Sequence, residues 1–499
     1  MRKSSFFYKP FLRWLILAVF FFGNVFTAQM AKAADSPCSG ITHEGLIIAG
    51  ETSCTGSDGL DSLTDHMAVQ AGVPLTIDPS LNWNTFLGGL GEDVVNDIAL
   101  DSEGNVYITG VSHATWGAPR RVYAGADDAF VAKLDSSGSL LWNTFLGSVG
   151  TESGNGITVD GDGNVYVTGD STATWGAPLH NFTIFCDAYV AKLDTSGDLI
   201  WNTFVGGYSF EHGTDIAMAG SNVVMSGWSD SEWGEGAPTT NYNAFAAELH
   251  SNGDLGWHTF LGGSGEEKSS SIAVNGSSGN VFVTGRSNAT WGTPIRAYTS
   301  DFDTYVAKLD SNGNLGWNTF LGGSKADESL GTAVDSDGNV LVIGKSTGTW
   351  GTPLRAYSGR QDAYVTKLTP DGVLTWNTFL GGSQDDIGVG IAVSSDNNIY
   401  VTGMGGDAWG YPLEAYHGGF DAFVASLSSE GALLKNTNLG SIVLDIGTSI
   451  AVNGTNLYVA GYSRGTWGTP VRAYSDLNDG FVSKLGNVTS AVFFPLILR

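Results

Sequence analysis

The sequence predicts an all-β fold, a seven-bladed β-propeller with four antiparallel strands in each blade. Three recurring strings predict it, because each occurs seven times among the 499 residues at intervals of about 59. The first is Trp-Asn-Thr-Phe, the second is Trp-Gly, and the third resembles Asp-Ala-Phe-Val-Ala-Lys-Leu. Four short strands repeated around an axis form a propeller, in which each unit packs against its neighbours.

The three strings recur in step. The first begins at Trp83, Trp142, Trp201, Trp257, Trp317 and Trp376, and Lys435 takes its place in the seventh copy. The third begins at Asp128, Asp187, Asn243, Asp303, Asp362, Asp421 and Asp479. The second begins at Trp116, Trp175, Trp233, Trp291, Trp350, Trp409 and Trp467.

Each unit contains four predicted strands, and the second unit serves as the example. The first two predicted strands are residues 157–160 and 165–169. A Gly-Asp-Gly-Asn turn joins them, in which glycine supplies the positive φ of a hairpin. A Trp-Gly loop leads to the third strand, 188–194, and a Ser-Gly turn leads to the fourth, 199–205. The 70 glycines and the low charged fraction of 15% suit such short strands and tight turns.

The ends of the repeats predict how the ring closes. The last unit has strands at 450–452, 457–461 and 481–485 and then stops, whereas an orphan fourth strand occurs at 81–87. We expect the N-terminal strand to complete the last blade and so remove two free sheet edges. An alternative has eight blades, with a degenerate unit at 41–70 and the tail residues 491–498 as the missing outer strand of the last blade.

The predicted organisation is a signal peptide (1–33), an N-terminal extension (34–80), the propeller (81–486) and an apolar tail (487–499). Basic residues precede an apolar run at 15–22, and a small-residue site, Ala31-Lys32-Ala33, follows it. An uncleaved membrane anchor is the alternative. The signal predicts an extracellular protein, secreted or attached to the cell surface, with no membrane span after cleavage.

Charge and cysteines narrow the partners and the environment. The net charge of −27 repels phosphate backbones and anionic lipids, which excludes nucleic acid and peripheral membrane binding. In an oxidising environment Cys38 and Cys54 are close enough in sequence to form a disulfide. Cys186 is left as either a small buried hydrophobe or a reactive thiol. We expect a monomer.

An acidic residue recurs five positions before each predicted inner strand. A ring of these carboxylates near the channel would suit Ca²⁺, the one cofactor that the sequence suggests. The alternative is architectural, with each carboxylate bonded to backbone N–H groups or to a recurring base, Arg121, Arg296, Arg355 or Arg472. The seven acidic residues are Asp93, Glu152, Glu211, Glu267, Asp327, Asp386 and Asp445.

Two other features are candidate ligand sites. The seven Trp-Gly tryptophans would suit a glycan or a protein if exposed, and would otherwise be core. The third unit is irregular and gathers acids, a histidine and an aromatic that could serve a hydrolase or lyase. These residues are Glu211, His212, Trp228, Glu232 and Glu235. Common signatures of zinc proteases and redox dithiols do not occur.

The repeats resemble the SBBP repeat, a β-propeller repeat of secreted and surface bacterial proteins. The strings that carry the resemblance are Asp335-Ser-Asp-Gly-Asn-Val-Leu-Val-Ile-Gly344, Asp362-Ala-Tyr-Val-Thr-Lys-Leu368 and Trp376-Asn-Thr-Phe-Leu-Gly-Gly382. The resemblance implies an extracellular propeller without a fixed activity. We therefore expect a non-enzymatic binding or scaffold module for protein or glycan ligands; a hydrolase or lyase, or a purely structural surface protein, are the alternatives.

Overall fold

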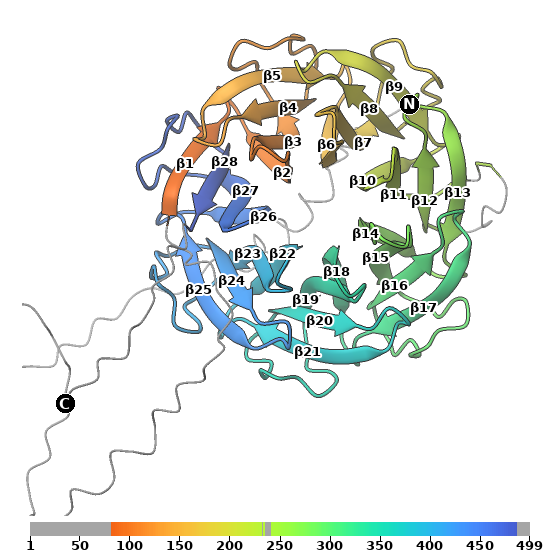
Figure 1. Cartoon of the computed structure of the whole chain (residues 1–499), viewed down its shortest axis with the longest axis vertical. Helices are drawn as coiled ribbons and strands as arrows, with labels where there is room; N and C mark the ends of the chain where they lie inside the picture. Colours follow the sequence, from red (N-terminus) through yellow and green to blue (C-terminus); the bar gives the residue numbers. More distant parts are fainter. Residues whose placement is uncertain (1–80, 232, 235–240, 487–499) are drawn as a thin grey trace, which may run out of the picture. The chain divides into compact units, whose positions relative to one another are not determined.

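The computed structural model describes residues 81–231, 233–234 and 241–486. They form 28 strands in seven four-stranded antiparallel sheets, arranged as blades around one axis (Figure 1). The predicted seven-bladed propeller is confirmed. The predictions for the signal peptide, for the Cys38–Cys54 disulfide and for the apolar tail concern residues outside the described ranges.

The blades share one strand order from the axis outwards. Blade 1 is β2 (Asp93–Leu100), β3 (Val106–Ser112), β4 (Asp128–Leu134) and β5 (Leu140–Leu146). Blade 2 is β6 (Glu152–Val159), β7 (Val165–Ser171), β8 (Asp187–Leu193) and β9 (Leu199–Val205). Blade 3 is β10 (Glu211–Ala219), β11 (Asn222–Ser229), β12 (Asn243–Leu249) and β13 (Leu255–Leu261). Blade 4 is β14 (Glu267–Val274), β15 (Val281–Ser287), β16 (Asp303–Leu309) and β17 (Leu315–Leu321).

The remaining blades repeat the pattern. Blade 5 is β18 (Asp327–Val334), β19 (Val340–Ser346), β20 (Asp362–Leu368) and β21 (Leu374–Leu380). Blade 6 is β22 (Asp386–Val393), β23 (Ile399–Gly405), β24 (Asp421–Leu427) and β25 (Leu433–Leu439). Blade 7 is β26 (Asp445–Asn453), β27 (Asn456–Ser463) and β28 (Asp479–Leu485), completed by β1 (Leu81–Leu87).

The ring closes as the sequence predicts. β1 pairs antiparallel with β28, with Phe86 opposite Phe481 and Leu87 opposite Gly480, so the first and last strands share a sheet (Figure 1, orange beside blue). Backbone bonds from Phe86 N to Arg472 O (3.1 Å) and from Val471 N to Asn84 O (2.8 Å) extend the closure. Opening the ring therefore requires breaking a sheet.

The inner strands begin earlier than the sequence suggests. β6 starts at Glu152, five residues before the predicted strand, and every inner strand carries a register shift near its third residue, as between Gly154 and Gly156. Such a β-bulge bends and twists the strand. The polar Ser-Gly-Asn-Gly stretch resembles a loop in sequence because the bulge tolerates small residues. The recurring acid is thus the first residue of a strand.

The Asp-x-x-Gly-Asn segments are hairpin turns, as predicted. Asp160 Oδ1 accepts bonds from the backbone N–H groups of Asp162 (3.0 Å) and Asn164 (2.8 Å), and Gly163 adopts a φ of 82°. The aspartate thus organises the turn and is occupied by backbone donors.

The hydrophobic core lies between neighbouring blades. One cluster joins Tyr107 and Val131 of blade 1 to Val165 and Tyr189 of blade 2, and equivalent clusters fill the other junctions. Both faces of each sheet are therefore apolar. Within the described residues no helix has the length and hydrophobicity that crossing a membrane requires.

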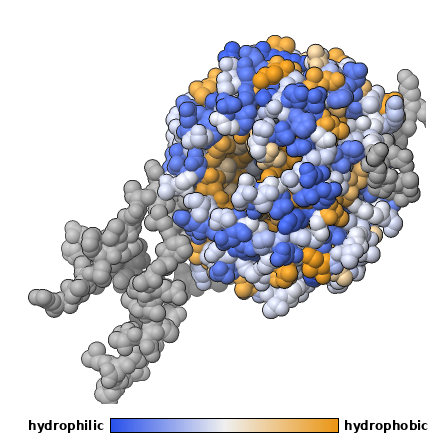
Figure 2. All heavy atoms as spheres, turned by 45° about the vertical axis from the view of Figure 1, so that its right-hand side comes forward, coloured by the Kyte–Doolittle hydropathy of each residue, from blue (hydrophilic) through white to orange (hydrophobic). Residues whose placement is uncertain are grey.

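Two sets of loops lie on the same face, which we call the top face. These are the loops that lead into each inner strand and the Trp-Gly loops, because antiparallel strands return the chain to this side. The tight hairpins lie on the opposite face. Figure 2 shows a hollow at the centre of the ring with apolar side chains around it.

Candidate functional site: the blade junctions

The seven recurring acids are buried at the junctions between blades. Each is at most 1% exposed and begins an inner strand. One carboxylate oxygen accepts a backbone N–H of the preceding loop, as from Ser148 to Glu152 (2.7 Å). The other accepts a serine hydroxyl in most blades, as from Ser171 to Glu152 (2.9 Å). These bonds fasten the entry loop to the blade.

Burial raises the pKa of all seven carboxyl groups, because water is withdrawn from the charged form. The pKa of Asp93 and Asp445 rises to about 6, and that of Glu152, Asp327 and Asp386 to about 7. Burial also raises the pKa of Glu211 and Glu267. The hydrogen bonds to each carboxylate oppose this effect but do not cancel it.

An arginine of the preceding blade occupies the same junction in four cases. Arg121 donates from Nη1 to Phe145 O (3.1 Å) and from Nη2 to Gly147 O (2.6 Å). Its guanidinium lies 5.6 Å from the ring centre of Trp175 in the next blade. We call this place the arginine slot. It is repeated at Arg296, Arg355 and Arg472.

The arginine slot also balances buried charge. Burial lowers the pKa of Arg121, and Asp128 and Glu152 on either side of the junction oppose that effect. A side chain added at Gly147 would come within 2.6 Å of both carboxylates' oxygens, which shows how closely the two acids approach there. The acids and arginines thus form the architectural fastening that the sequence left as the alternative to a metal ring.

The structure does not bring the seven carboxylates together as a calcium ring. Each points into its own junction and is bonded there. In the described part of the chain, one group of three or more His, Cys, Asp or Glu side chains has its ligand atoms within 4.8 Å of one another, and it contains none of the seven.

The Trp-Gly tryptophans lie in the interior. Six are 3–8% exposed and Trp233 is half-buried. Trp116 packs edge-on against Phe130 with 5.3 Å between ring centres, and Asn143 Nδ2 holds its carbonyl oxygen (2.9 Å). The six buried rings are core elements under the following loop, so they do not offer the glycan-binding faces considered above.

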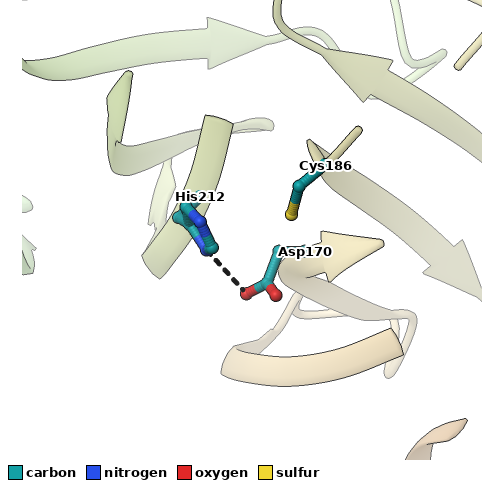
Figure 3. A group of neighbouring side chains, drawn as sticks. All are labelled: Asp170, Cys186 and His212. Atoms are coloured by element: carbon teal, nitrogen blue, oxygen red, sulfur yellow. Dashed lines mark ion pairs between the residues drawn. The ribbon is translucent and has the colours of Figure 1, made fainter. Parts of the chain in front are cut away.

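His212 is the centre of a second junction cluster, between blades 2 and 3. Its ring stacks on Trp228 with 4.0 Å between centres, and its Nδ1 lies 3.5 Å from Asp170 Oδ1. Figure 3 shows Asp170, Cys186 and His212 directed toward one another. Of the other residues predicted here, Glu211 is a junction acid, and Glu232 and Glu235 lie outside the described ranges.

Asp170, Cys186 and His212 are residue types that bind Zn²⁺, and their ligand atoms lie within 4.8 Å. Burial raises the pKa of the Cys186 thiol, followed by the charge of Asp170, so the thiol is protonated and faces Glu211 O at 3.8 Å. Burial also acts to raise the pKa of Asp170, but His212 and nearby hydrogen bonds outweigh it and the pKa is lowered. As described, the cluster is a His–Asp pair beside a neutral thiol.

At other junctions the residues equivalent to Asp170, Cys186 and His212 also contact one another. Between blades 3 and 4, Lys268 Nζ lies 4.1 Å from the ring centre of Trp228 and 3.9 Å from that of Tyr242. Between blades 4 and 5, Arg286 meets Glu328 (3.0 Å) and Phe302 (4.8 Å). The Asp-Cys-His group therefore belongs to a series of junction contacts. Sequence reasoning missed the series because its members come from different units.

Sequence reasoning also missed two partly buried aspartates. Asp97 and Asp215 occupy the bulge of β2 and β10, where blades 2 and 5 have Gly156 and Gly331. Asp97 accepts from the N–H of Ile157, and Asp215 from that of Ile272. Burial, and then the charge of Asp97, raise the pKa of Asp215 to about 7. The signal in the sequence is the departure from Gly or Ser at this position.

One loop position of the top face carries exposed apolar residues in a single arc of the ring, whereas the Trp-Gly loops carry them in other blades as well, such as Leu354 and Tyr411. At the tip of the loop into the inner strand, blades 7, 1, 2 and 3 carry side chains that are 76–86% exposed. These blades are consecutive around the ring. The same position is serine in blades 4, 5 and 6: Ser264, Ser324 and Ser383. We call the four residues the apolar arc: Ile442, Leu90, Val149 and Tyr208.

Comparisons with known proteins agree with the repeat and with the fold. The family model of the SBBP β-propeller repeat matches residues 82–115, 146–174 and 375–407, which confirms the resemblance seen in the sequence. The regulatory protein FlaEY of Caulobacter vibrioides is 28% identical over 212 residues, covering 39% of this chain and 22% of that protein. An uncharacterized WD repeat-containing protein of Acanthamoeba polyphaga mimivirus is 22% identical over 379 residues, covering 62% and 24%. The chain thus spans less than a quarter of either relative.

Two solved structures match this chain at low sequence identity. The WD40 β-propeller domain of Doa1 matches with a TM-score of 0.46 and 10% identity, over 81% of this chain and 97% of that one. A puromycin hydrolase mutant complexed with PGG matches with a TM-score of 0.43 and 14% identity, over 75% and 50%. The fold assignment rests on the strand pairing of this chain itself.

Proposed function

We propose that this propeller is a secreted or surface-exposed binding module for a protein partner, which it contacts through the apolar arc of its top face. The arc is the observation that carries the proposal. Ile442, Leu90, Val149 and Tyr208 are 80%, 76%, 86% and 82% exposed. Apolar side chains concentrated on one side of a surface mark interaction sites more often than isolated ones do.

The chemistry of the arc favours a protein over a glycan. Three of its four residues are aliphatic, whereas sugar rings are bound mainly by aromatic faces with polar groups beside them. Six of the seven tryptophans that could have offered such faces are in the core. The recurring carboxylates are likewise engaged inside the junctions. The surface that differs between blades is therefore the one available for recognition.

The proposal is tested with a variant built from the protein's own repeats. Replacing the four arc residues by serine copies the loops of blades 4, 5 and 6 and leaves the core untouched. The control variant, Leu141→Ser with Ile200→Ser, changes residues on the outer strands that are 53% and 52% exposed. Partners captured from the source organism's medium and envelope are identified, purified and titrated against all three proteins.

We expect the arc variant to bind the purified partner at least about a hundredfold more weakly, because a few central apolar residues supply most interface energy. The control variant should bind within about threefold of the wild type. Equal binding by the arc variant, or equal loss in both variants, contradicts the proposal. Circular dichroism of both variants establishes that they are folded.

A further inference from the structure

The arginine slot that blade 2 would fill lacks its arginine. At the position of Arg121, blade 2 has His180, whose side chain is exposed instead of entering the junction. Among the described junctions, blades 1, 4, 5 and 7 supply their own arginine, and blade 6 has Glu414 at this place. The corresponding residue of blade 3 lies outside the described ranges. The junction between blades 2 and 3 therefore has the surroundings of an arginine without the side chain.

The vacated slot is a hollow of about 300 Å³. Its lining includes His180, Asp187, Phe204, Gly206 and Trp233. Phe204 and Gly206 correspond to Phe145 and Gly147, whose carbonyl oxygens accept the two guanidinium bonds of Arg121. Trp233 corresponds to Trp175, on which Arg121 lies. The acceptors and the aromatic wall of an arginine site are thus in place.

Two further observations show that the hollow is polar and acidic. Thr203 is 1% exposed and lines the hollow, and its hydroxyl oxygen has no hydrogen-bond partner. Its counterpart Thr144 accepts the backbone N–H of Arg121 (3.2 Å). Asp187 and Glu211 flank the slot as Asp128 and Glu152 flank that of Arg121. Burial raises the pKa of both, and Glu211 feels the charge of Asp187 without an arginine to offset it.

We propose that the vacated slot between blades 2 and 3 binds a guanidinium group, supplied by an arginine side chain of the partner protein. The planar fork of a guanidinium fits two carbonyl oxygens and an aromatic face, which a lysine ammonium matches less well. Tyr208 of the apolar arc lies two residues beyond Gly206, so the same partner reaches both. The identity of the donor as a partner residue rests on the proposed function; binding of a guanidinium does not.

The test uses a small probe and the whole chain. Nα-acetyl-L-arginine N-methylamide carries the guanidinium without other charges, and the citrulline analogue has the same shape without the charge. Binding is measured by isothermal titration calorimetry and by thermal shift at millimolar probe. The variants are His180→Arg, which fills the slot as in four other blades, and Arg355→Ala, which opens a second one.

We expect the wild type to bind one equivalent of the arginine probe and to discriminate at least about tenfold against the citrulline analogue. His180→Arg should lose probe binding and unfold at a higher temperature without probe. Arg355→Ala should gain a second binding event. No saturable binding to the wild type, or equal binding to His180→Arg, overturns the inference. Neither assay involves the apolar arc or the partner protein. If the wild type does not bind the probe, the proposed function therefore still stands or falls on its own test.

Discussion

The serine that holds each junction acid is missing in blade 6, and restoring it should stabilise the protein. In five blades the last residue of the second strand is a serine bonded to the acid: Ser112, Ser171, Ser229, Ser287 and Ser463. Blade 6 has Gly405 instead, and Asp386 Oδ1 is buried without a partner. The perturbation is Gly405→Ser.

The magnitude follows from three contributions. A hydrogen bond to a charged group is worth about 1.5–3 kcal/mol, and replacing glycine in an extended strand stabilises by about 0.4–1 kcal/mol through the unfolded chain. A Cβ at Gly405 meets Asp386 Oδ1 at 3.1 Å and Trp409 Nε1 at 3.5 Å, so the carboxylate must shift slightly. We expect a net gain of about 1–2 kcal/mol in the free energy of unfolding.

The assay is equilibrium urea unfolding, with a higher midpoint at an unchanged slope. Gly405→Ala isolates the effects of chain entropy and contact from that of the hydroxyl. The gain should be larger at pH 8 than at pH 5, because the serine favours ionised Asp386, whose pKa burial raises to about 7. The reasoning is refuted if Gly405→Ser is no more stable than Gly405→Ala at pH 8.

Three more predictions concern the same fastenings. The folded pKa values of about 6–7 for acids such as Glu152 and Asp445 exceed the unfolded values, so the stabilisation from these acids is complete below about pH 4 and is lost as pH rises through 6–7. The protein should therefore unfold at a higher temperature at pH 5 than at pH 8. If 0.5 M salt abolishes this difference, the difference comes from surface charge instead. Arg355→Ala removes hydrogen bonds to Phe379 O (3.0 Å) and Gly381 O (2.7 Å) and should lower the free energy of unfolding in urea by about 3 kcal/mol. Arg355→Lys should recover less than half of this loss. A loss under about 1 kcal/mol for Arg355→Ala would show that the arginine slot contributes little. Millimolar Ca²⁺ should leave the melting temperature where EDTA leaves it, since the seven carboxylates do not converge, whereas a clear rise with Ca²⁺ would restore the metal ring.

The sequence was sufficient for the fold because the repeated strings carry it. Trp-Asn-Thr-Phe at 83–86 without preceding strands predicted the closing strand, and the Asp-x-x-Gly-Asn turns predicted hairpins. The first residues of the inner strands were harder to predict from the sequence. The bulge after Glu152 contains glycines, which obscure the alternating pattern of a β-strand. The burial of Trp116 also could not be read from its identity, since a tryptophan serves a core and a binding face equally well.

The sites depend on contacts between units, which one repeat does not display. Asp170 and His212 belong to neighbouring copies, and their pairing appears only when blades pack face to face. The vacated slot was easier to predict from the sequence. When the repeats are aligned, His180 occupies the position of Arg121 and Arg296, so the loss of the arginine is visible. Only the structure shows that the absence of an arginine leaves two carbonyl oxygens and the ring of Trp233 open in the hollow.

The proposed function is recognition of a protein through the top face of blades 7, 1, 2 and 3. Hydrogen–deuterium exchange of the propeller with and without its purified partner tests this directly. We predict slower exchange at 440–444, 88–92, 147–151 and 206–210, with no change at 262–266, 322–326 and 381–385. Protection of those three serine-tipped loops, or of the hairpins on the opposite face instead of the arc, would contradict the account.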